Sequence, residues 1–391
     1  MPLSLYLLAV AVFAMGTSEF MLAGLLPDIA DDLGVPVGEA GLLTAAFAVG
    51  MAVGAPLMAA LARRWPRRTA LLAFLGLFFA AHVVGAVADG LPVLLGTRVI
   101  AALANAGFLA VALTTAAALV PADRKGRALS VLLGGTTAAT IAGVPGGALL
   151  GALLGWRAAF WAVALGCAPA ALGVLRGVPG GRGGSRSSAD PRLRAELAEL
   201  RRPRLAVVMA GTALVTAGTF GAFTFLAPVV TEVAGLGPFW VPVALVLFGV
   251  GSLAGVTFAG RLSDARPGTV LAVCGPLLPV GWAAFALAAP HPVALLTMTL
   301  VQGALGFAVG STLIARVLYE ASGAPTMAGS YATAALNVGA AAGPVLAAAT
   351  LDASATGPAW TAVALAVAAL LCAPVFRALA VRGILVEGAG R

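Results

Sequence analysis

The chain contains apolar runs long enough to cross a lipid bilayer, and these runs constrain its fold more than any other feature. Breaking the sequence at prolines, glycines and charge clusters gives twelve such runs, each of about 20 residues or more. With 61% hydrophobic and 10% charged residues, the composition is far from that of soluble domains. The runs are too long and too rich in Leu, Ala and Gly for barrel strands. We therefore expect an all-α membrane protein with twelve transmembrane helices.

The first run lacks a small-residue cleavage site and eleven comparable runs follow it, so we interpret it as a retained span rather than a signal peptide. The predicted spans are Ser4–Pro27, Glu39–Ala62, Thr69–Ala88, Leu91–Leu119, Ala128–Leu154, Ala158–Val178, Leu205–Val230, Pro238–Gly260, Gly268–Ala289, Pro292–Leu318, Met327–Leu351 and Pro358–Val381.

The basic residues sort to one side of the predicted membrane. With the N-terminus in the cytoplasm, 21 of the 23 basic residues face inward, in the cytoplasmic loops, at the cytoplasmic ends of spans or in the C-terminal tail. Only Arg157 faces outward, and Arg98 lies within a span. An excess of Lys and Arg on the cytoplasmic side is typical of membrane proteins. We therefore expect a multi-pass membrane protein with both termini in the cytoplasm. The basic pI follows from topology, and we expect no nucleic-acid partner.

The two halves of the sequence resemble each other. RRWPRR after the second span and SDARP after the eighth place Pro66 and Pro267 201 residues apart. GVP in the fifth span and AGP in the eleventh place Pro145 and Pro344 199 residues apart. Parallel repeats of six helices are the layout of a rocker-type transporter. We predict two pseudo-symmetric six-helix bundles, residues 1–178 and 205–391. Residues 179–204 then form a cytoplasmic linker, either a flexible connector or a regulatory contact.

Several segments together resemble the major facilitator superfamily, and more narrowly its twelve-helix drug–proton antiporters. The similar segments are GTSEFMLAGLLPDIADDLGV, LARRWPRR, VPADRKGRAL, GVPGGALLGALLGWRAAF and ALNVGAAAGP. Among these antiporters the sequence most resembles the actinobacterial chloramphenicol-resistance exporters. The resemblance implies proton-coupled efflux of a hydrophobic, chloramphenicol-like drug by a monomer without a cofactor. A broader multidrug exporter, an exporter of a sugar or other metabolite, and a non-transporting sensor remain alternatives.

The loop after the second span departs from the family pattern. Ala59, Arg63 and Pro66 replace the usual first Gly, Asp and second Gly, whereas the second copy, GRLSDARP, keeps the acid. Any cytoplasmic charge lock of the family type would therefore depend on Asp264 and on basic loop residues. These basic residues are Arg64, Arg67 and Arg68.

Two charges lie inside predicted spans. Glu19 precedes Pro27 by eight residues, and Arg98 follows Leu91 by seven, so both lie about 10–12 Å from the outer face. Asn105 lies seven residues beyond Arg98, on the same helix face. An ionisable residue inside a membrane is costly and is usually functional. We predict that Glu19 and Arg98 couple transport to protons; a structural Glu–Arg pair is the alternative.

Glycines recur every fourth residue in the fifth span, at Gly143, Gly147, Gly151 and Gly155. This spacing predicts a helix face without side chains, against which another backbone can pack closely. Pro145 lies within the series and favours a bend. The resemblance implies that Gly143, Pro145, Gly147 and Gly151 control leak and the direction of transport, and helix packing alone is the alternative.

A pocket for an aryl drug needs aromatic side chains and a few hydrogen-bonding groups. Span seven concentrates three phenylalanines in TFGAFTFLAP, although such residues also face lipid or the core. The predicted substrate-binding residues are Asn105, Phe108, Phe220, Phe223, Phe225, Gln302, Tyr331 and Asn337.

Other function classes lack their motifs. Lys125 is the only lysine and is followed by Gly-Arg, so there is no phosphate-binding Gly-Lys-Ser/Thr loop of an ATP-driven pump. We find no catalytic nucleophile–base pair, no repeated selectivity-filter motif, and no spacing of the three cysteines that suggests a disulfide or metal site. His82 and His291 are isolated, and we expect both to be structural or interfacial. We therefore predict neither an enzyme nor a metal site.

Overall fold

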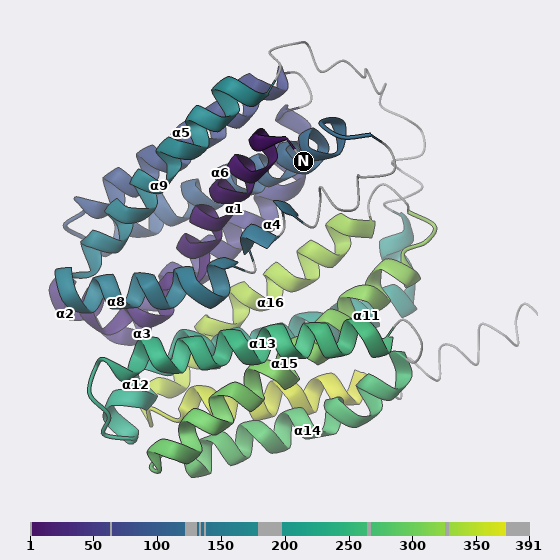
Figure 1. The fold of residues 1–391 in the computed structure, drawn as a ribbon. Coiled ribbons are helices and arrows are strands. Elements are labelled where there is room, and N and C mark those ends of the chain that lie inside the picture. The colour runs from purple at the N-terminus through teal and green to yellow at the C-terminus, as the bar shows by residue number, and fades with distance from the viewer. Residues whose placement is uncertain are drawn as a thin grey trace, which may run out of the picture. The chain divides into compact units, whose positions relative to one another are not determined.

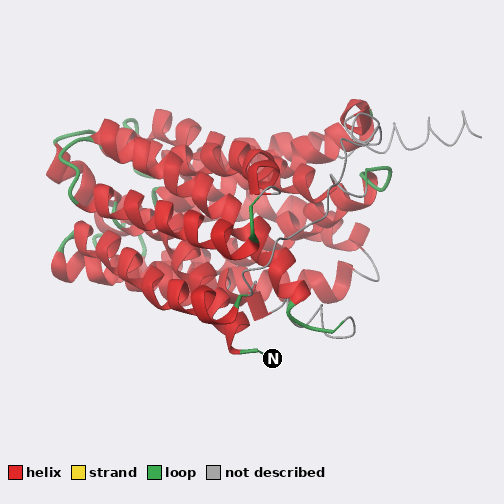
Figure 2. Cartoon of the chain, turned by 90° about the horizontal axis from the view of Figure 1, so that it is seen from above, coloured by secondary structure: helices red, strands yellow, loops and turns green. Residues whose placement is uncertain are grey.

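The computed structural model describes residues 2–62, 65–121, 131–132, 134–136, 138–178, 198–263, 267–324 and 328–372. Regular structure in these ranges is entirely helical, as predicted (Figures 1 and 2). The labelled α-helices longer than three residues are α1 Leu3–Phe20, α2 Leu26–Leu33, α3 Val37–Ala40, α4 Leu42–Ala62, α5 Arg67–Ala86, α6 Leu91–Ala118, α8 Val144–Leu154, α9 Trp156–Gly177, α11 Pro203–Thr224, α13 Trp240–Ser263, α14 Pro267–Ala288, α15 Pro292–Glu320 and α16 Ala328–Leu351.

Within these ranges, 10 helices are long and apolar enough to cross a membrane. Two shorter apolar helices, Val144–Leu154 and Gly357–Cys372, occupy the fifth and twelfth predicted spans, parts of which lie outside the described residues. Large apolar side chains such as Leu165 and Leu287 are exposed, at 66% and 71%. Such exposure is unfavourable in water and favourable against lipid tails.

The first and seventh spans are broken before their C-terminal ends, whereas the sequence predicted each as one helix. After α1, a 3₁₀ turn at Met21–Gly24 leads into α2. After α11, the three-residue helix α12 (Leu226–Pro228) leads into a π-helical turn at Val229–Val233. Both halves of the repeat therefore have a helix break in this span, although the turns that follow the two breaks differ.

The chain divides into two compact units. The first comprises Met1–Ser185 with Phe223–Gly249, and the second Arg186–Ala222 with Val250–Arg391. The predicted division into bundles at residues 178 and 205 stays a prediction.

In the first unit, α1 packs against α9 and against the fifth span, α5 packs against α6 and α9, and α4 packs against α6.

A charged clamp joins the start of α9 to α2. Arg157 in the first turn of α9 pairs with Asp32 of α2, donates to the Ala88 carbonyl at 3.0 Å, and stacks on Trp156. The indole of Trp156 donates to Asp32 at 3.2 Å. This hydrogen bonding, with that from Arg157 largest, holds the pKa of the Asp32 carboxyl below its ordinary value.

In the second unit, glycines allow close helix packing. A side chain at Gly339 or Gly343 of α16 would overlap backbone carbonyls of α11. At the end of α15, the buried Glu320 carboxylate lies 3.5 Å from the guanidinium groups of both Arg204 and Arg316. The 3₁₀ turn Glu199–Arg201 lies beside this end, where a side chain at Gly323 would meet the Glu199 carboxylate at 2.7 Å. The last residues of the predicted linker therefore contact this unit.

Candidate functional site

A buried arginine forms the centre of the candidate site. Arg98 of α6 is 1% exposed and reaches α1, where it contacts one residue twice. Its Nη1 donates to Ser18 Oγ at 2.8 Å, and its Nη2 donates to the Ser18 carbonyl at 2.7 Å. Hydrogen bonds from a charged donor are stronger than neutral ones, and these two fix the guanidinium against α1.

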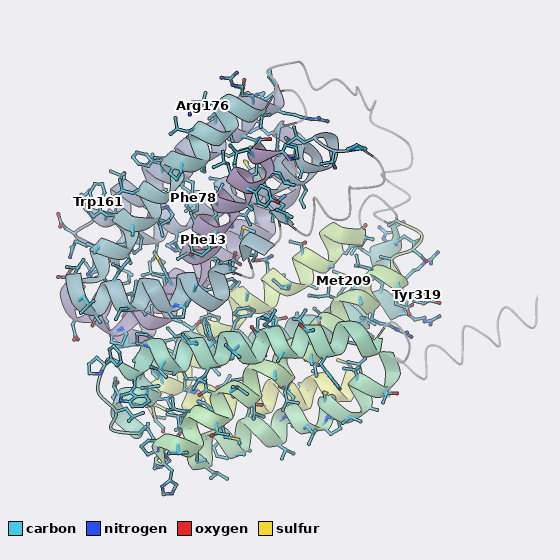
Figure 3. All side chains as sticks on the ribbon, viewed as in Figure 1. Phe13, Phe78, Trp161, Arg176, Met209 and Tyr319 are labelled. Atoms are coloured by element: carbon cyan, nitrogen blue, oxygen red, sulfur yellow. The ribbon has the colours of Figure 1, made fainter. Side chains whose placement is uncertain are left out.

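A histidine extends this network. His82 of α5 is 1% exposed, and its Nε2 lies 2.6 Å from Ser18 Oγ. Its Nδ1 lies 2.8 Å from the Phe78 carbonyl, and its ring packs 4.1 Å from the Phe78 ring centroid. Figure 3 marks Phe78 inside the first unit and Trp161 on its outer side. The sequence predicted that His82 is structural or interfacial, and did not connect it to Arg98.

Apart from Ser18, the guanidinium contacts an aromatic ring, and one of its N–H groups has no acceptor among the described residues. The Cζ atom of Arg98 lies 4.4 Å from the centroid of the Phe47 ring on α4. A desolvated cation–π contact of this kind contributes about 2 kcal/mol. The Nε of Arg98 is buried and has no hydrogen-bond partner in the described part of the chain. One N–H group of a buried cation is thus available to an acceptor.

Glu19 lies in the last turn of α1 and is the residue after Ser18. The Arg98 guanidinium and the Glu19 carboxyl are near enough for their charges to interact. Among the described residues, however, no ion pair within 4.0 Å joins Arg98 to a carboxylate. The sequence left open whether the two side chains touch. In this structure Arg98 binds Ser18 instead of Glu19.

This arrangement has a definite chemical capacity. A buried guanidinium lies near an unpaired, half-buried carboxylate, and both side chains come from helices that span the membrane. A carboxylate in such a place can exist protonated or ionised, and the position of the neighbouring cation decides which form is favoured. The site can therefore hold and release a proton without a cofactor. No group of three potential metal ligands gathers within the described ranges.

The two predicted binding residues on α6 differ in exposure. Asn105 is 6% exposed, and its amide makes no side-chain hydrogen bond to the described residues. Phe108 is 0% exposed and is enclosed by its neighbours. In this conformation Asn105 retains unused hydrogen-bonding capacity, whereas Phe108 presents no surface to a ligand.

The predicted aromatic residues of the seventh span lie in different surroundings. Phe223 stacks on Phe248 with 4.6 Å between centroids, and both belong to the first unit. Phe225 of this unit is 0% exposed and packs where Gly41 leaves room. Phe220 belongs to the second unit and meets Phe307 edge-on at 6.1 Å. The sequence grouped the three residues, but the structure packs each against a different partner.

Three predicted polar residues lie buried in the second unit. Gln302 of α15 fills the space left by Gly281, donates to the Leu278 carbonyl at 3.4 Å, and keeps an unpartnered Oε1 within the described chain. Asn337 of α16 donates to the Thr333 carbonyl at 2.9 Å. Tyr331 lies in the first turn of the same helix and is also buried. Of the three, Gln302 offers a buried acceptor to a ligand.

The glycine series of the fifth span packs against the first span, as its spacing predicts. A side chain at Gly143 would meet Thr17, one at Gly147 would meet Met21, and one at Gly151 would meet Leu25. The contacts advance by four residues on both helices.

The fourth glycine of the series does not belong to this face, and here the sequence interpretation was wrong. Gly155 has φ +84° and ends α8, and a side chain there would meet nothing within 4 Å. Pro145 is buried in the first turn of α8, directly after a π-helical turn at Ala139–Gly143. The irregular turn and the packing glycines therefore lie on the same helix.

The predicted charge lock is only partly described. Arg67 and Arg68 begin α5 and are half-buried. Arg64 and Asp264 lie outside the described residues.

Comparison with known proteins identifies the family. The model of the Major Facilitator Superfamily matches residues 8–329. The chain belongs to this superfamily. A Streptomyces lividans protein named chloramphenicol resistance protein is 72% identical over 351 residues, which cover 90% of each chain. The inner membrane transport protein YdhP of Escherichia coli is 34% identical over 350 residues, covering 88% of this chain and 87% of YdhP.

Solved transporters share the fold. The nucleoside transporter NupG aligns with a TM-score of 0.73 at 16% identity, covering 96% of this chain and 99% of its own. A bacterial homologue of the human lysosomal transporter Spinster aligns with a TM-score of 0.71 at 18% identity, covering 96% and 95%. The expected all-α, twelve-helix major facilitator fold is thus confirmed, and the chain is a multi-pass membrane transporter.

Proposed function

We propose that this protein exports chloramphenicol or a related hydrophobic drug across the bacterial cytoplasmic membrane in exchange for protons, and so confers resistance. The observation that carries the proposal is the 72% identity to a protein named for chloramphenicol resistance, over 90% of both chains.

Glu19 is the proposed proton carrier. It binds a proton from outside when the site opens there and drug leaves, and it releases the proton when the site opens inward. Arg98 supplies the neighbouring positive charge, which favours the ionised carboxylate more strongly when the two groups approach. Each proton that enters yields about 2.3 kcal/mol per 100 mV of membrane potential, enough to sustain a drug gradient of tens-fold.

The proposed drug contacts are aromatic and neutral polar groups. Chloramphenicol is uncharged, so its binding needs no counter-ion, and Glu19 remains available to protons. The open amide of Asn105 and the unpartnered oxygen of Gln302 support a role in hydrogen bonding to the drug. We propose that the remaining surface of the drug pocket is formed by Tyr331, Asn337 and the predicted phenylalanines.

The packed glycines and the cytoplasmic charges are proposed to control the conformational change. Gly143, Gly147 and Gly151 seat the fifth span on the helix that carries Glu19, so that movement of one displaces the other. Both termini are proposed to be cytoplasmic, on the charge distribution. The protein is proposed to act as a monomer within the lipid bilayer, without a cofactor and without enzymatic activity.

The experiment that tests this function is drug transport in proteoliposomes with an imposed pH gradient. Wild-type protein should accumulate chloramphenicol against its gradient, and an uncoupler should abolish that accumulation. Glu19→Gln keeps the shape and hydrogen bonding of the side chain but cannot cycle charge. It should bind drug and lose uphill transport. Uphill transport by this variant at the wild-type level would show that another group carries the proton.

A panel of drugs and metabolites in the same vesicles defines the substrate. Uphill transport of chloramphenicol together with many unrelated drugs would identify a broader multidrug exporter. Transport of a sugar in place of every drug would contradict the proposal.

A further inference from the structure

The buried network contains a histidine to which no role has been assigned. We propose that His82 is a positioning residue for proton coupling: through Ser18 it holds the Arg98 guanidinium away from Glu19. This inference rests on the proposed function, because it concerns the residue proposed to carry the proton.

The first step of the argument counts donors. The nitrogens of an arginine only donate, so Ser18 Oγ accepts from Arg98 Nη1 at 2.8 Å. A carbonyl only accepts, so His82 Nδ1 carries a hydrogen and donates it to Phe78 at 2.8 Å. The one hydroxyl hydrogen of Ser18 then points to His82 Nε2 at 2.6 Å.

Each group in the network therefore donates a hydrogen bond to the next, from Arg98 to Ser18, from Ser18 to His82, and from His82 to the Phe78 carbonyl. It requires a neutral imidazole with a free lone pair on Nε2. An imidazolium would place a second buried cation beside Arg98 and would leave the Ser18 hydroxyl hydrogen without this acceptor. His82 therefore fixes the direction in which the hydroxyl of Ser18 points.

The second step concerns what Arg98 does if this acceptor is lost. A serine in a helix readily turns its hydroxyl to a carbonyl one turn earlier. Ser18 Oγ then leaves Arg98 Nη1, and the guanidinium has one further donor, Nε, already unpartnered in the described chain. The nearest carboxylate in sequence is Glu19, the next residue. An ion pair with Arg98 would favour the ionised form of Glu19.

The surroundings contain few competing charges. Glu19 and Arg98 are the charged groups that interact with this site from α1 and α6, and His82 is the titratable group from α5. The fifth span and α4 contribute no titratable side chain in their described parts. On α9, the Cys167 thiol donates to the Val163 carbonyl of its own helix. Whether Arg98 binds Ser18 or Glu19 therefore depends on the hydrogen bonds among Arg98, Ser18 and His82, rather than on another charged group.

The test measures the pH dependence of uphill chloramphenicol transport in proteoliposomes at a fixed membrane potential. His82→Leu removes the acceptor, and Ser18→Ala removes the hydroxyl. Both variants should move the pH of half-maximal transport to lower pH by about one unit or more, because a new ion pair opposes protonation of Glu19. Drug–drug exchange needs no net proton movement and should continue in both.

Two control variants separate positioning from packing. His82→Gln keeps an acceptor for the Ser18 hydroxyl and should retain the wild-type pH of half-maximal transport. His291→Gln changes the other histidine, which lies exposed in a loop, and should also behave as wild type.

The outcomes distinguish this inference from the proposed function. If Glu19→Gln abolishes uphill transport while His82→Leu and Ser18→Ala keep the wild-type pH dependence, His82 has no positioning role. An equal acid shift in His82→Gln would also overturn the inference, because that variant retains the acceptor. If Glu19→Gln pumps normally, another group carries the proton, and the role proposed for Glu19 fails together with this inference; a wild-type protein that shows no uphill transport of chloramphenicol overturns the proposed function itself. Should His82→Leu not accumulate in the membrane, the smaller Ser18→Ala change decides the question.

Discussion

Replacing Gly143 by alanine tests the packing between the fifth span and the helix that carries the buried network. An alanine Cβ at this position would overlap Thr17 Oγ1 and would lie 3.0 Å from Thr17 Cβ and 3.1 Å from Thr17 Cγ2. Gly146, three residues later, offers the matched control because a Cβ there meets nothing within 4 Å. Both substitutions add a methyl group to the same span, but only the one at Gly143 meets another helix.

The expected loss in free energy of unfolding depends on how Thr17 can accommodate the added methyl group. Rotation about χ1 would break the 2.8 Å hydrogen bond from Thr17 Oγ1 to the Phe13 carbonyl, worth about 0.5–1.5 kcal/mol. Rotation leaves Thr17 Cβ in place at 3.0 Å, so the two helices must also move apart. Overpacking of this kind costs about 1–3 kcal/mol. The gain in helix propensity, up to about 1 kcal/mol, is similar in both variants and largely cancels.

We therefore expect Gly143→Ala to have a free energy of unfolding about 1–3 kcal/mol below that of Gly146→Ala. Denaturant titration in mixed micelles, followed by tryptophan fluorescence, gives this difference. Because Thr17 precedes Ser18, displacement of α1 should also slow uphill drug transport by Gly143→Ala in vesicles with equal protein. Equal stability of the two variants would refute the close packing inferred at Gly143.

Two further predictions concern charges outside the membrane core. The pKa of Asp32 is held below its ordinary value by Arg157, so this clamp stabilises the fold fully above the unfolded pKa near 3.9 and is lost as pH falls through the folded pKa. Asp32→Asn should therefore be less stable than wild type near neutral pH, and thermal unfolding should show the difference vanish in acid; a difference independent of pH would contradict it. Glu320→Gln should lower the free energy of unfolding by about 1 kcal/mol, since its two arginine partners stay partly solvated. Denaturant titration beside the exposed control Glu232→Gln measures this, and equal values for the two variants would argue against a stabilising cluster at the end of α15.

Much of the fold could be predicted because bilayer thickness imposes helix length on an apolar sequence. The start of α15 at Pro292 was predicted to the residue, since proline favours the first turn of a helix. The breaks after Phe20 and Thr224 were not predicted, because both sides of each break are apolar and the run continues through it. Whether such a run stays α-helical depends on packing against other helices, which the sequence pattern does not contain.

The candidate site could be predicted only in part, for a related reason. Glu19 and Arg98 were found because a charge inside an apolar run is conspicuous, and their depth followed from helix rise. Ser18 and His82 were missed as partners because a serine is ordinary in a membrane helix and an isolated histidine carries no spacing signal. Their relation is a contact across 64 residues of sequence, between α1 and α5. The one hint in the sequence was that Ser18, a polar residue, lies next to Glu19 within the apolar run.

The two halves of the repeat share the helix break but not the charges. Pro27 and Pro228 follow the breaks and are 201 residues apart, the same separation as Pro66 and Pro267. At this separation, the counterpart of Glu19 is Phe220, which packs edge-on against another phenylalanine. Burial of a charge costs several kcal/mol unless partners satisfy it, so a second copy of the network would double that cost. In the proposed function Glu19 carries the proton and the drug is neutral, so one titratable site suffices and the corresponding position in the other half can hold an aromatic side chain. The difference between Glu19 and Phe220 at corresponding positions is therefore what the proposed separation of the proton site from the drug site predicts.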